Sequence, residues 1–157
     1  VEVSALDVGD LNDIVRIDRA LTGRSRRGFL ERRLEAALRD SSVRVALKAR
    51  VQGDVVGFLL GAVYYGEFGV PEPSAVVDVL GVHPEFAGRH VGAALFRQLE
   101  MQLRALAIDT LRTEVDWSQQ PLLAFLQHRG FVPAPRLCLE KNLGSGVSLS
   151  ASGRPTR

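Results

Sequence analysis

The segment between residues 74 and 107 constrains this chain most, because a strand, a short glycine-containing turn and a helix follow one another there without a break. Residues 74–82 are rich in β-branched valine and predict a strand. Residues 91–107 place apolar side chains at i, i+4 intervals among polar ones and predict an amphipathic helix. The first N–H groups of such a helix lack intrahelical partners and carry partial positive charge. The turn before it is therefore predicted to bind an anion.

The turn also carries a characteristic residue order. Residues 82–95 are Val-His-Pro-Glu-Phe-Ala-Gly-Arg-His-Val-Gly-Ala-Ala-Leu. This order resembles the acyl-coenzyme A loop of the GNAT acetyltransferase superfamily, whose core pattern is Gln/Arg-x-x-Gly-x-Gly/Ala. Gly92, followed by Ala93, keeps its place in that pattern. Ala87 stands in place of the usual Gln or Arg, and His90 stands in place of the first glycine.

The resemblance extends toward the C-terminus and implies a fold. Residues 117–131 are similar to the last helix of the family with its Gly-Phe exit, and residues 137–141 are similar to its closing strand. The similarity covers residues 74–142 and implies a single-domain α/β (α+β) GNAT fold over residues 1–143. That fold has a mixed, mostly antiparallel central sheet of about six to seven strands with helices on both faces. The Gly- and Ser-rich residues 144–157 predict a flexible tail.

The first half of the chain supplies further elements. Short apolar runs predict strands over residues 1–6, 42–51, 55–65 and 109–115, and the turn at residues 52–54 makes the second and third a hairpin. Asp7 or Asp10 is expected to cap a first helix, and a second helix is expected from about Arg27. In the resembled family this helical pair forms one wall of the acceptor site.

The resemblance implies acetyl-coenzyme A as co-substrate. The strand end at Leu80, Gly81 and Val82 would pair with the pantetheine amides, and the N–H of Leu80 or Val82 would polarise the thioester carbonyl. Gln119 would keep an amide contact near the pantetheine arm. Backbone N–H groups of the turn would hold the pyrophosphate, at Gly88, Arg89, His90, Val91, Gly92 and Ala93.

A general base is sought among the carboxylates near this strand. Strict alternation places Asp78 on one side with Val76 and Leu80, and places Val77 and Val79 on the other. As the lone carboxylate of an apolar strand, Asp78 is predicted to be buried, and burial would make it a better proton acceptor. Glu67, in the loop before the strand, and Glu114, on the neighbouring strand, are rival bases.

The general acid is less well defined. The position at which the family often has a tyrosine that reprotonates the leaving thiolate holds Leu126, which cannot donate a proton. Two alternatives stay open. The thiolate leaves without help, or Tyr64 or Tyr65 reaches the site from another strand.

One group of arginines stands out in an otherwise balanced charge pattern. Arg24, Arg26 and Arg27 are close in sequence, and Arg32 and Arg33 follow over the next turns. One interpretation is a solvated helix face with Glu31 and Glu35 as partners. The other is a clamp for an acidic substrate or for the 3′-phosphate of the cofactor.

Composition limits the function classes. A net charge of +2 over 157 residues argues against a nucleic-acid partner. The chain has neither a membrane-length apolar run nor a signal-peptide pattern, so we expect no membrane partner and a cytoplasmic protein. No Cys/His/Asp spacing suggests a metal site. The single cysteine, Cys138, is expected to pack in the core. The single tryptophan, Trp117, is expected either to pack in the core or to line the acceptor cleft.

These observations favour an acetyl-CoA-dependent N-acetyltransferase that acts by direct attack of an amine in a ternary complex. The acceptor stays open between a small-molecule amine and a protein or peptide amine. The alternative is a non-catalytic acyl-CoA-binding or protein-interaction module on the same fold, in which the changes at Ala87, His90 and Leu126 have removed turnover. Family habit leaves a homodimer open.

Overall fold

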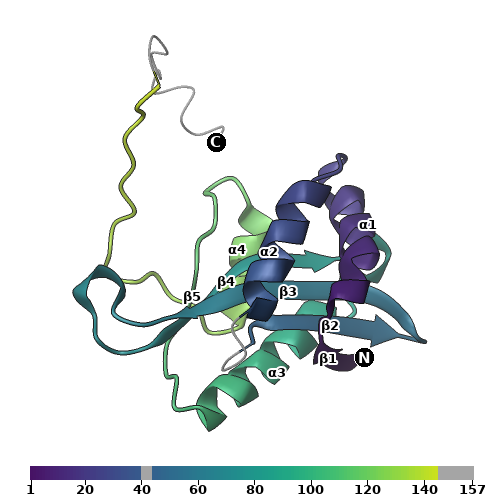
Figure 1. The fold of residues 1–157 in the computed structure, drawn as a ribbon, viewed down its shortest axis with the longest axis horizontal. Coiled ribbons are helices and arrows are strands. Elements are labelled where there is room, and N and C mark those ends of the chain that lie inside the picture. Colours follow the sequence, from purple (N-terminus) through teal and green to yellow (C-terminus); the bar gives the residue numbers. More distant parts are fainter. Residues whose placement is uncertain (40–43, 145–157) are drawn as a thin grey trace. The chain divides into compact units, whose positions relative to one another are not determined.

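The computed structural model describes residues 1–39 and 44–144. Two compact units are distinguished, Val1–Thr113 and Glu114–Arg157 (Figure 1). Apart from Gly144, the predicted tail lies outside the described residues, as does the beginning of the strand predicted from Ser42.

The first unit is built on one five-stranded sheet with the strand order β1-β2-β3-β4-β5. The strands are β1 (Glu2–Ala5), β2 (Ala46–Val51), β3 (Asp54–Tyr64), β4 (Ser74–Val82) and β5 (Leu111–Thr113). Neighbours from β1 to β4 are antiparallel, and β5 is parallel to β4. The predicted mixed, mostly antiparallel sheet is therefore confirmed, with five strands in the described residues where six to seven were expected.

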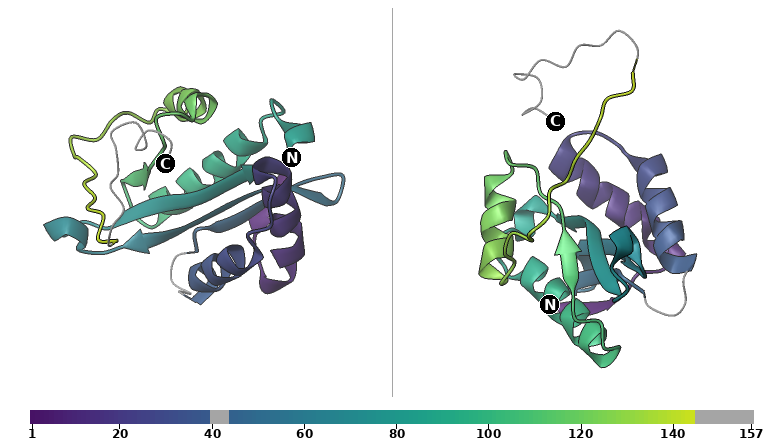
Figure 2. Two further views of the ribbon diagram at one scale, coloured as in Figure 1. Left: turned by 90° about the horizontal axis from the view of Figure 1, so that it is seen from above. Right: turned by 90° about the vertical axis from the view of Figure 1, so that its left-hand side faces the viewer.

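Helices cover both faces of this sheet, as predicted. In Figure 2 (left), α1 (Leu11–Thr22) and α2 (Arg27–Arg39) lie on one side of the strands and α3 (Val91–Ala105) lies on the other. Asp7 caps a short 3-10 turn before α1, where its carboxylate accepts a hydrogen bond from the Gly9 N–H. Gly23 ends α1 in the left-handed conformation.

A single apolar cluster holds α1 and α2 on the sheet. Fully buried Phe58 and Leu60 of β3 pack with Val79 of β4 against Ile14 and Ile17 of α1. Leucines of α2, Leu30 and Leu34, complete the cluster. This packing fixes α2 on the sheet, and Arg33, which lies next to Leu34 in α2, reaches Asp78 of β4.

The second unit contains α4 (Gln120–His128) and an extended segment after it. Gly130, at a φ of 92°, ends the helix, and the Phe131 N–H donates to the Leu126 carbonyl at 3.0 Å, so the predicted helix and Gly-Phe exit are confirmed. The predicted strand at residues 137–141 is wrong. Leu137, Cys138 and Leu139 are extended, unpaired and exposed, because an alternating pattern makes a strand only where a neighbouring strand accepts its hydrogen bonds.

Two further expectations of burial are also wrong. Trp117 and Cys138 are both exposed in the second unit, although core packing was the expectation for Cys138 and one of two expectations for Trp117. Among the helices of the described residues, none combines the length and the apolar content that crossing a bilayer requires.

Candidate functional site

A β-bulge in β4 shapes the site. Leu60 of β3 lies opposite Val79, and the next residue of β3, Gly61, lies opposite Val77, so Asp78 is an extra residue with no partner on β3. The strict alternation predicted for this strand is therefore wrong at Asp78. Val79 packs into the α1–α2 cluster and the Asp78 carboxylate pairs with Arg33 of α2, so these two consecutive side chains both point toward the helical pair. This is the local geometry that a bulge imposes.

Past the bulge, one edge of β4 is open. The strand β5 pairs with β4 only at Ala75, Val76 and Val77, and no other described strand continues that pairing toward Val82. The His83 N–H donates to the Val56 carbonyl of β3 at 2.8 Å, which fixes the directions of the peptide groups before it. Because these directions alternate along a strand, the peptide groups of Leu80 and Val82 face the open edge. They are available to a ligand with amide groups of its own.

The turn after β4 presents further free donors. A 3-10 turn at Pro84–Phe86 leads to α3, whose first helical residue is Val91. No hydrogen bond within the described residues engages the N–H groups of Gly88, His90, Val91, Gly92 and Ala93. Four of these groups belong to the N-cap and first turn of α3, so the partial positive charge of the helix dipole adds to them. The geometry is that of an anion-binding helix N-terminus.

His90 adopts a backbone conformation that favours glycine. Its φ is 61°, in the left-handed region, and Gly88 two residues earlier has a φ of 74°. Histidine is one of the few non-glycine residues that enter this region with any frequency. His90 is an exposed residue.

The candidate base Asp78 is not buried. Its side chain is 28% exposed and forms an ion pair with Arg33, whose side chain is 30% exposed. The prediction of a buried carboxylate is therefore wrong, because the bulge turns Asp78 to the same side as Val79, where its carboxylate meets the solvent-accessible guanidinium of Arg33. What the structure does bring together is a carboxylate and a guanidinium, both solvent-accessible, beside the open edge of β4.

The fold and this edge agree with the comparison to known families. The family model described as "Acetyltransferase (GNAT) family" matches residues 11–131, which is more than half of the chain. The chain belongs to the GNAT family of acetyltransferases. It is therefore an acyltransferase of the GNAT class, and its open β4 edge and α3 N-terminus lie within the matched residues.

Several solved structures share the fold of this GNAT chain at low sequence identity. A transcriptional regulator from Bacillus halodurans C-125 superposes with a TM-score of 0.76 at 16% identity, over 91% of this chain and 99% of the other. Aminoglycoside N-acetyltransferase AAC(6′)-Iy, solved in complex with CoA, superposes with a TM-score of 0.75 at 14% identity, over 91% of this chain and 95% of the other. A ribosomal-protein-alanine N-acetyltransferase from Brucella melitensis biovar Abortus 2308 superposes with a TM-score of 0.70 at 20% identity, over 91% of this chain and 100% of the other.

Two of the rival acid–base residues of this GNAT chain, Glu67 and Tyr65, lie in the loop between β3 and β4. Glu67 is exposed in the loop between β3 and β4, beyond the Tyr64–Ser74 pair that closes the hairpin. That pair is four residues along β4 from Asp78, about 13 Å at the usual rise of a strand. Tyr65 is exposed in the same loop, and Glu114 is exposed directly after β5. Gln119 is an exposed N-cap residue of α4, and Leu126 is buried within the same helix.

Three members of the arginine group have specific partners, whereas Arg24 and Arg32 are exposed. Arg26 donates two hydrogen bonds to the buried carboxylate of Asp18, Arg27 donates to Asn12, and Arg33 pairs with Asp78. The expected partners Glu31 and Glu35 make none of the ion pairs found in the described residues. The Asp18 carboxylate raises the pKa of Arg26 above its ordinary value, because its hydrogen bonds favour the charged guanidinium.

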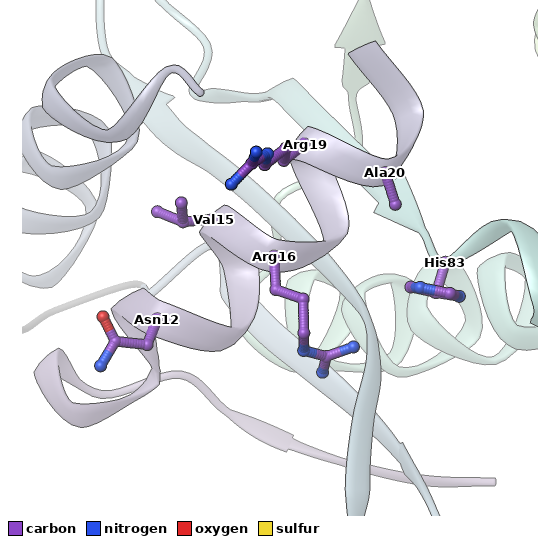
Figure 3. Close-up of a pocket in the computed structure, with 6 residues that line it drawn as sticks. All are labelled: Asn12, Val15, Arg16, Arg19, Ala20 and His83. Atoms are coloured by element: carbon purple, nitrogen blue, oxygen red, sulfur yellow. The ribbon is translucent and has the colours of Figure 1, made fainter. Parts of the chain in front are cut away.

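Sequence reasoning missed one surface feature, an open groove of about 540 Å³ beside α1. In Figure 3, Arg16 and Ala20 extend from α1 on the side where His83 stands, just past the end of β4. Asn12, Val15 and Arg19 complete the lining. The i, i+4, i+7 spacing of Asn12, Arg16 and Arg19 on one helix was the signal that marks this polar stripe. Within residues 1–39 and 44–144, His, Cys, Asp and Glu side chains form no group of three able to hold a metal ion.

Proposed function

We propose that this GNAT protein transfers an acetyl group from acetyl-CoA to a primary amine by direct attack in a ternary complex. The observation that carries the proposal is the open edge of β4 leading directly into unpaired N–H groups at the start of α3. A thioester cofactor with an amide-containing arm and a pyrophosphate needs these two features in this order. Residues 1–143 form the proposed acetyltransferase domain.

The cofactor's charged end is assigned to the α3 N-terminus. Its pyrophosphate would accept hydrogen bonds from the backbone N–H groups of Gly88, His90, Val91, Gly92 and Ala93, which require no particular side chain; the Arg89 N–H instead donates to the Phe86 carbonyl at 3.3 Å. Arg89 stands in the middle of this turn with its guanidinium 5.1 Å from the centre of the Phe86 ring, and adds positive charge there. By resemblance to the family, Gln119 would contact the pantetheine arm.

The cofactor's reactive end is assigned to the β4 edge. The pantetheine amides would pair with the peptide groups of Leu80 and Val82 as a further strand would, with Gly81 between them. An N–H of the same edge would donate to the thioester carbonyl and stabilise the oxyanion that forms there. In the reaction the amine nitrogen bonds to the carbonyl carbon, the carbon–sulfur bond breaks, and coenzyme A leaves as its thiolate.

The amine must lose a proton, and Asp78 is the proposed acceptor of it. It lies two residues from Leu80, about 7 Å along the strand, so an amine bound between them would be near both the carbonyl and the carboxylate. Glu67, which lies beyond the end of the hairpin, is the rival. The acceptor is a small-molecule amine or the amine of a protein or peptide. Both classes are supported by structural neighbours, which include an aminoglycoside N-acetyltransferase and a ribosomal-protein-alanine N-acetyltransferase.

The test is acetyl-CoA-dependent release of free thiol with a panel of primary amines, followed by mass measurement of the acetylated product. Asp78→Asn should lower transfer mainly at pH values below the acceptor's pKa, where the amine needs a base. Glu67→Gln is the matched control and should leave the pH profile unchanged. Binding of acetyl-CoA without transfer to any amine would overturn the proposal in favour of a non-catalytic acyl-CoA-binding module.

A further inference from the structure

The ion pair between Arg33 and Asp78 carries information about the acceptor. It joins α2 to the bulge of β4, and both side chains are about one-third exposed, so a ligand can reach either of them. Leu30 and Leu34, which precede and follow Arg33 in α2, are buried and hold this helix on the sheet. The guanidinium is therefore held in place over β4, not carried on a mobile segment.

Arg33 has hydrogen-bond donors that Asp78 does not use. One of its terminal nitrogens, Nη2, donates to Asp78, and no other hydrogen bond of Arg33 is found within the described residues. A guanidinium offers five N–H donors in a planar fork that matches a carboxylate. The position can therefore accept a second carboxylate from a ligand beside that of Asp78.

The pair also limits which amines suit the site. An ammonium that approaches Asp78 also approaches the positive charge of Arg33, and the two repel each other. While Arg33 is bound, its charge opposes protonation of the carboxylate that should accept the amine's proton. An acceptor with a carboxylate next to its amine removes both difficulties, because its carboxylate takes the guanidinium and its ammonium takes Asp78.

We propose that the acceptor is a primary amine with a neighbouring carboxylate, as in an α-amino acid, and that Arg33 binds that carboxylate. This inference rests on the proposed acetyl transfer and names its substrate class. On binding, the ligand carboxylate exchanges with that of Asp78 at Arg33. Asp78 then takes one proton from the ammonium, the freed amine attacks the thioester carbon, the carbon–sulfur bond breaks, and the nitrogen releases its second proton to solvent as the amide forms. The proton on Asp78 passes to the departing thiolate through solvent.

Three probes of matched size test it: phenylalanine, phenylalanine amide and phenethylamine, compared by kcat/KM and corrected for the fraction of free amine. The wild-type protein should prefer phenylalanine to the amide by about 10- to 100-fold, the range expected for a hydrogen-bonded charge pair. Arg33→Gln should abolish this preference, leaving transfer to the amide and to phenethylamine equal to or faster than that of the wild type. Arg33→Lys should keep part of the preference, because it keeps the charge without the planar fork.

Arg32→Gln is the matched control, since Arg32 is the exposed neighbour of Arg33 and pairs with no carboxylate in the described residues. Its preference should equal that of the wild type. A merely structural role of Arg33 would lower transfer to all three probes equally in Arg33→Gln, and that result would overturn the inference. Transfer without any preference for the carboxylate would overturn it as well, with the acetyltransferase function intact. Transfer to no amine at all would overturn both proposals.

Discussion

Gly61 is the residue on which the bulge of β4 depends most directly. A Cβ built on Gly61 would lie 2.0 Å from the carbonyl oxygen of Val76 and 2.8 Å from a methyl group of Val45. Real Cβ atoms essentially never approach another heavy atom closer than 3.0 Å. The Val76 oxygen belongs to the backbone of β4 and cannot rotate away. Gly61→Ala therefore forces β3 and β4 apart next to the bulge.

The expected cost follows from this contact. Overpacking a core with one methyl group costs about 1–3 kcal/mol, and a clash with backbone belongs at the upper end, about 3 kcal/mol. With an m-value of about 1–3 kcal/mol/M in urea, the unfolding midpoint should fall by about 1–3 M. Because the separation begins beside the open edge of β4, affinity for acetyl-CoA should fall as well, under conditions in which the variant is still folded.

The assay is equilibrium unfolding in urea together with calorimetric titration of acetyl-CoA. Gly57→Ala is the matched control in the same strand, where the nearest atom is a methyl group of Val91 at 2.7 Å. That side chain can shift, so we expect a cost of about 1 kcal/mol in stability. The reasoning fails if Gly61→Ala costs no more than Gly57→Ala, or if it binds acetyl-CoA as tightly as the wild type.

Three further predictions follow from single contacts. His90→Gly relieves the left-handed strain at a φ of 61° and should stabilise the protein by up to about 1 kcal/mol in thermal unfolding; destabilisation would contradict the strain. Arg26→Gln leaves the carboxylate of Asp18, 4% exposed, without its charged partner and should cost about 3–5 kcal/mol. Asp18→Asn should cost less, because Arg26 is 32% exposed and can turn to water, and equal losses in chemical unfolding would refute this asymmetry. The Gly9 N–H holds the pKa of Asp7 below its ordinary value of 3.8, so its contribution to stability is present above pH 3.8 and is lost as the pH falls through the lower folded-state pKa. Asp7→Asn should flatten the acid limb of the stability curve, and an unchanged limb would remove Asp7 as its cause.

The order of elements was predictable from the sequence because each carries a local signal. The valine-rich run predicted β4 with its observed bounds, Ser74–Val82, and the i, i+4 leucines predicted α3 to within two residues of its end at Ala105. Periodicity of this kind is a property of neighbouring residues and needs no knowledge of tertiary contacts. The glycine-containing turn before α3 was predictable for the same reason.

The surroundings of Asp78 were not predictable, because a bulge is a feature of two strands. Alternation along β4 alone assigns Asp78 to the side opposite Val79, and only the register of β4 with Leu60 and Gly61 shows that Asp78 is the extra residue. Its partner Arg33 is 45 residues away in the sequence. The unpaired segment around Leu137 failed for a related reason, since a strand pattern does not specify a neighbour.

The most direct test of the account is calorimetric titration of the wild-type protein and of Gly92→Glu and Ala93→Glu with acetyl-CoA, with the unfolding temperature of each measured alongside. The wild type should bind with micromolar affinity and gain thermal stability, because the ligand binds only the folded state. Ala93→Glu, at a half-buried position, should stay folded, since a carboxylate in the first turn of α3 suits the helix dipole, whereas Gly92→Glu changes a buried residue and serves only where its unfolding temperature shows it folded. Each folded variant should lose binding by at least about 10-fold through repulsion of the pyrophosphate. No binding to the wild type at millimolar acetyl-CoA, or equal binding to all three proteins, would contradict the assignment of the cofactor to β4 and the α3 N-terminus.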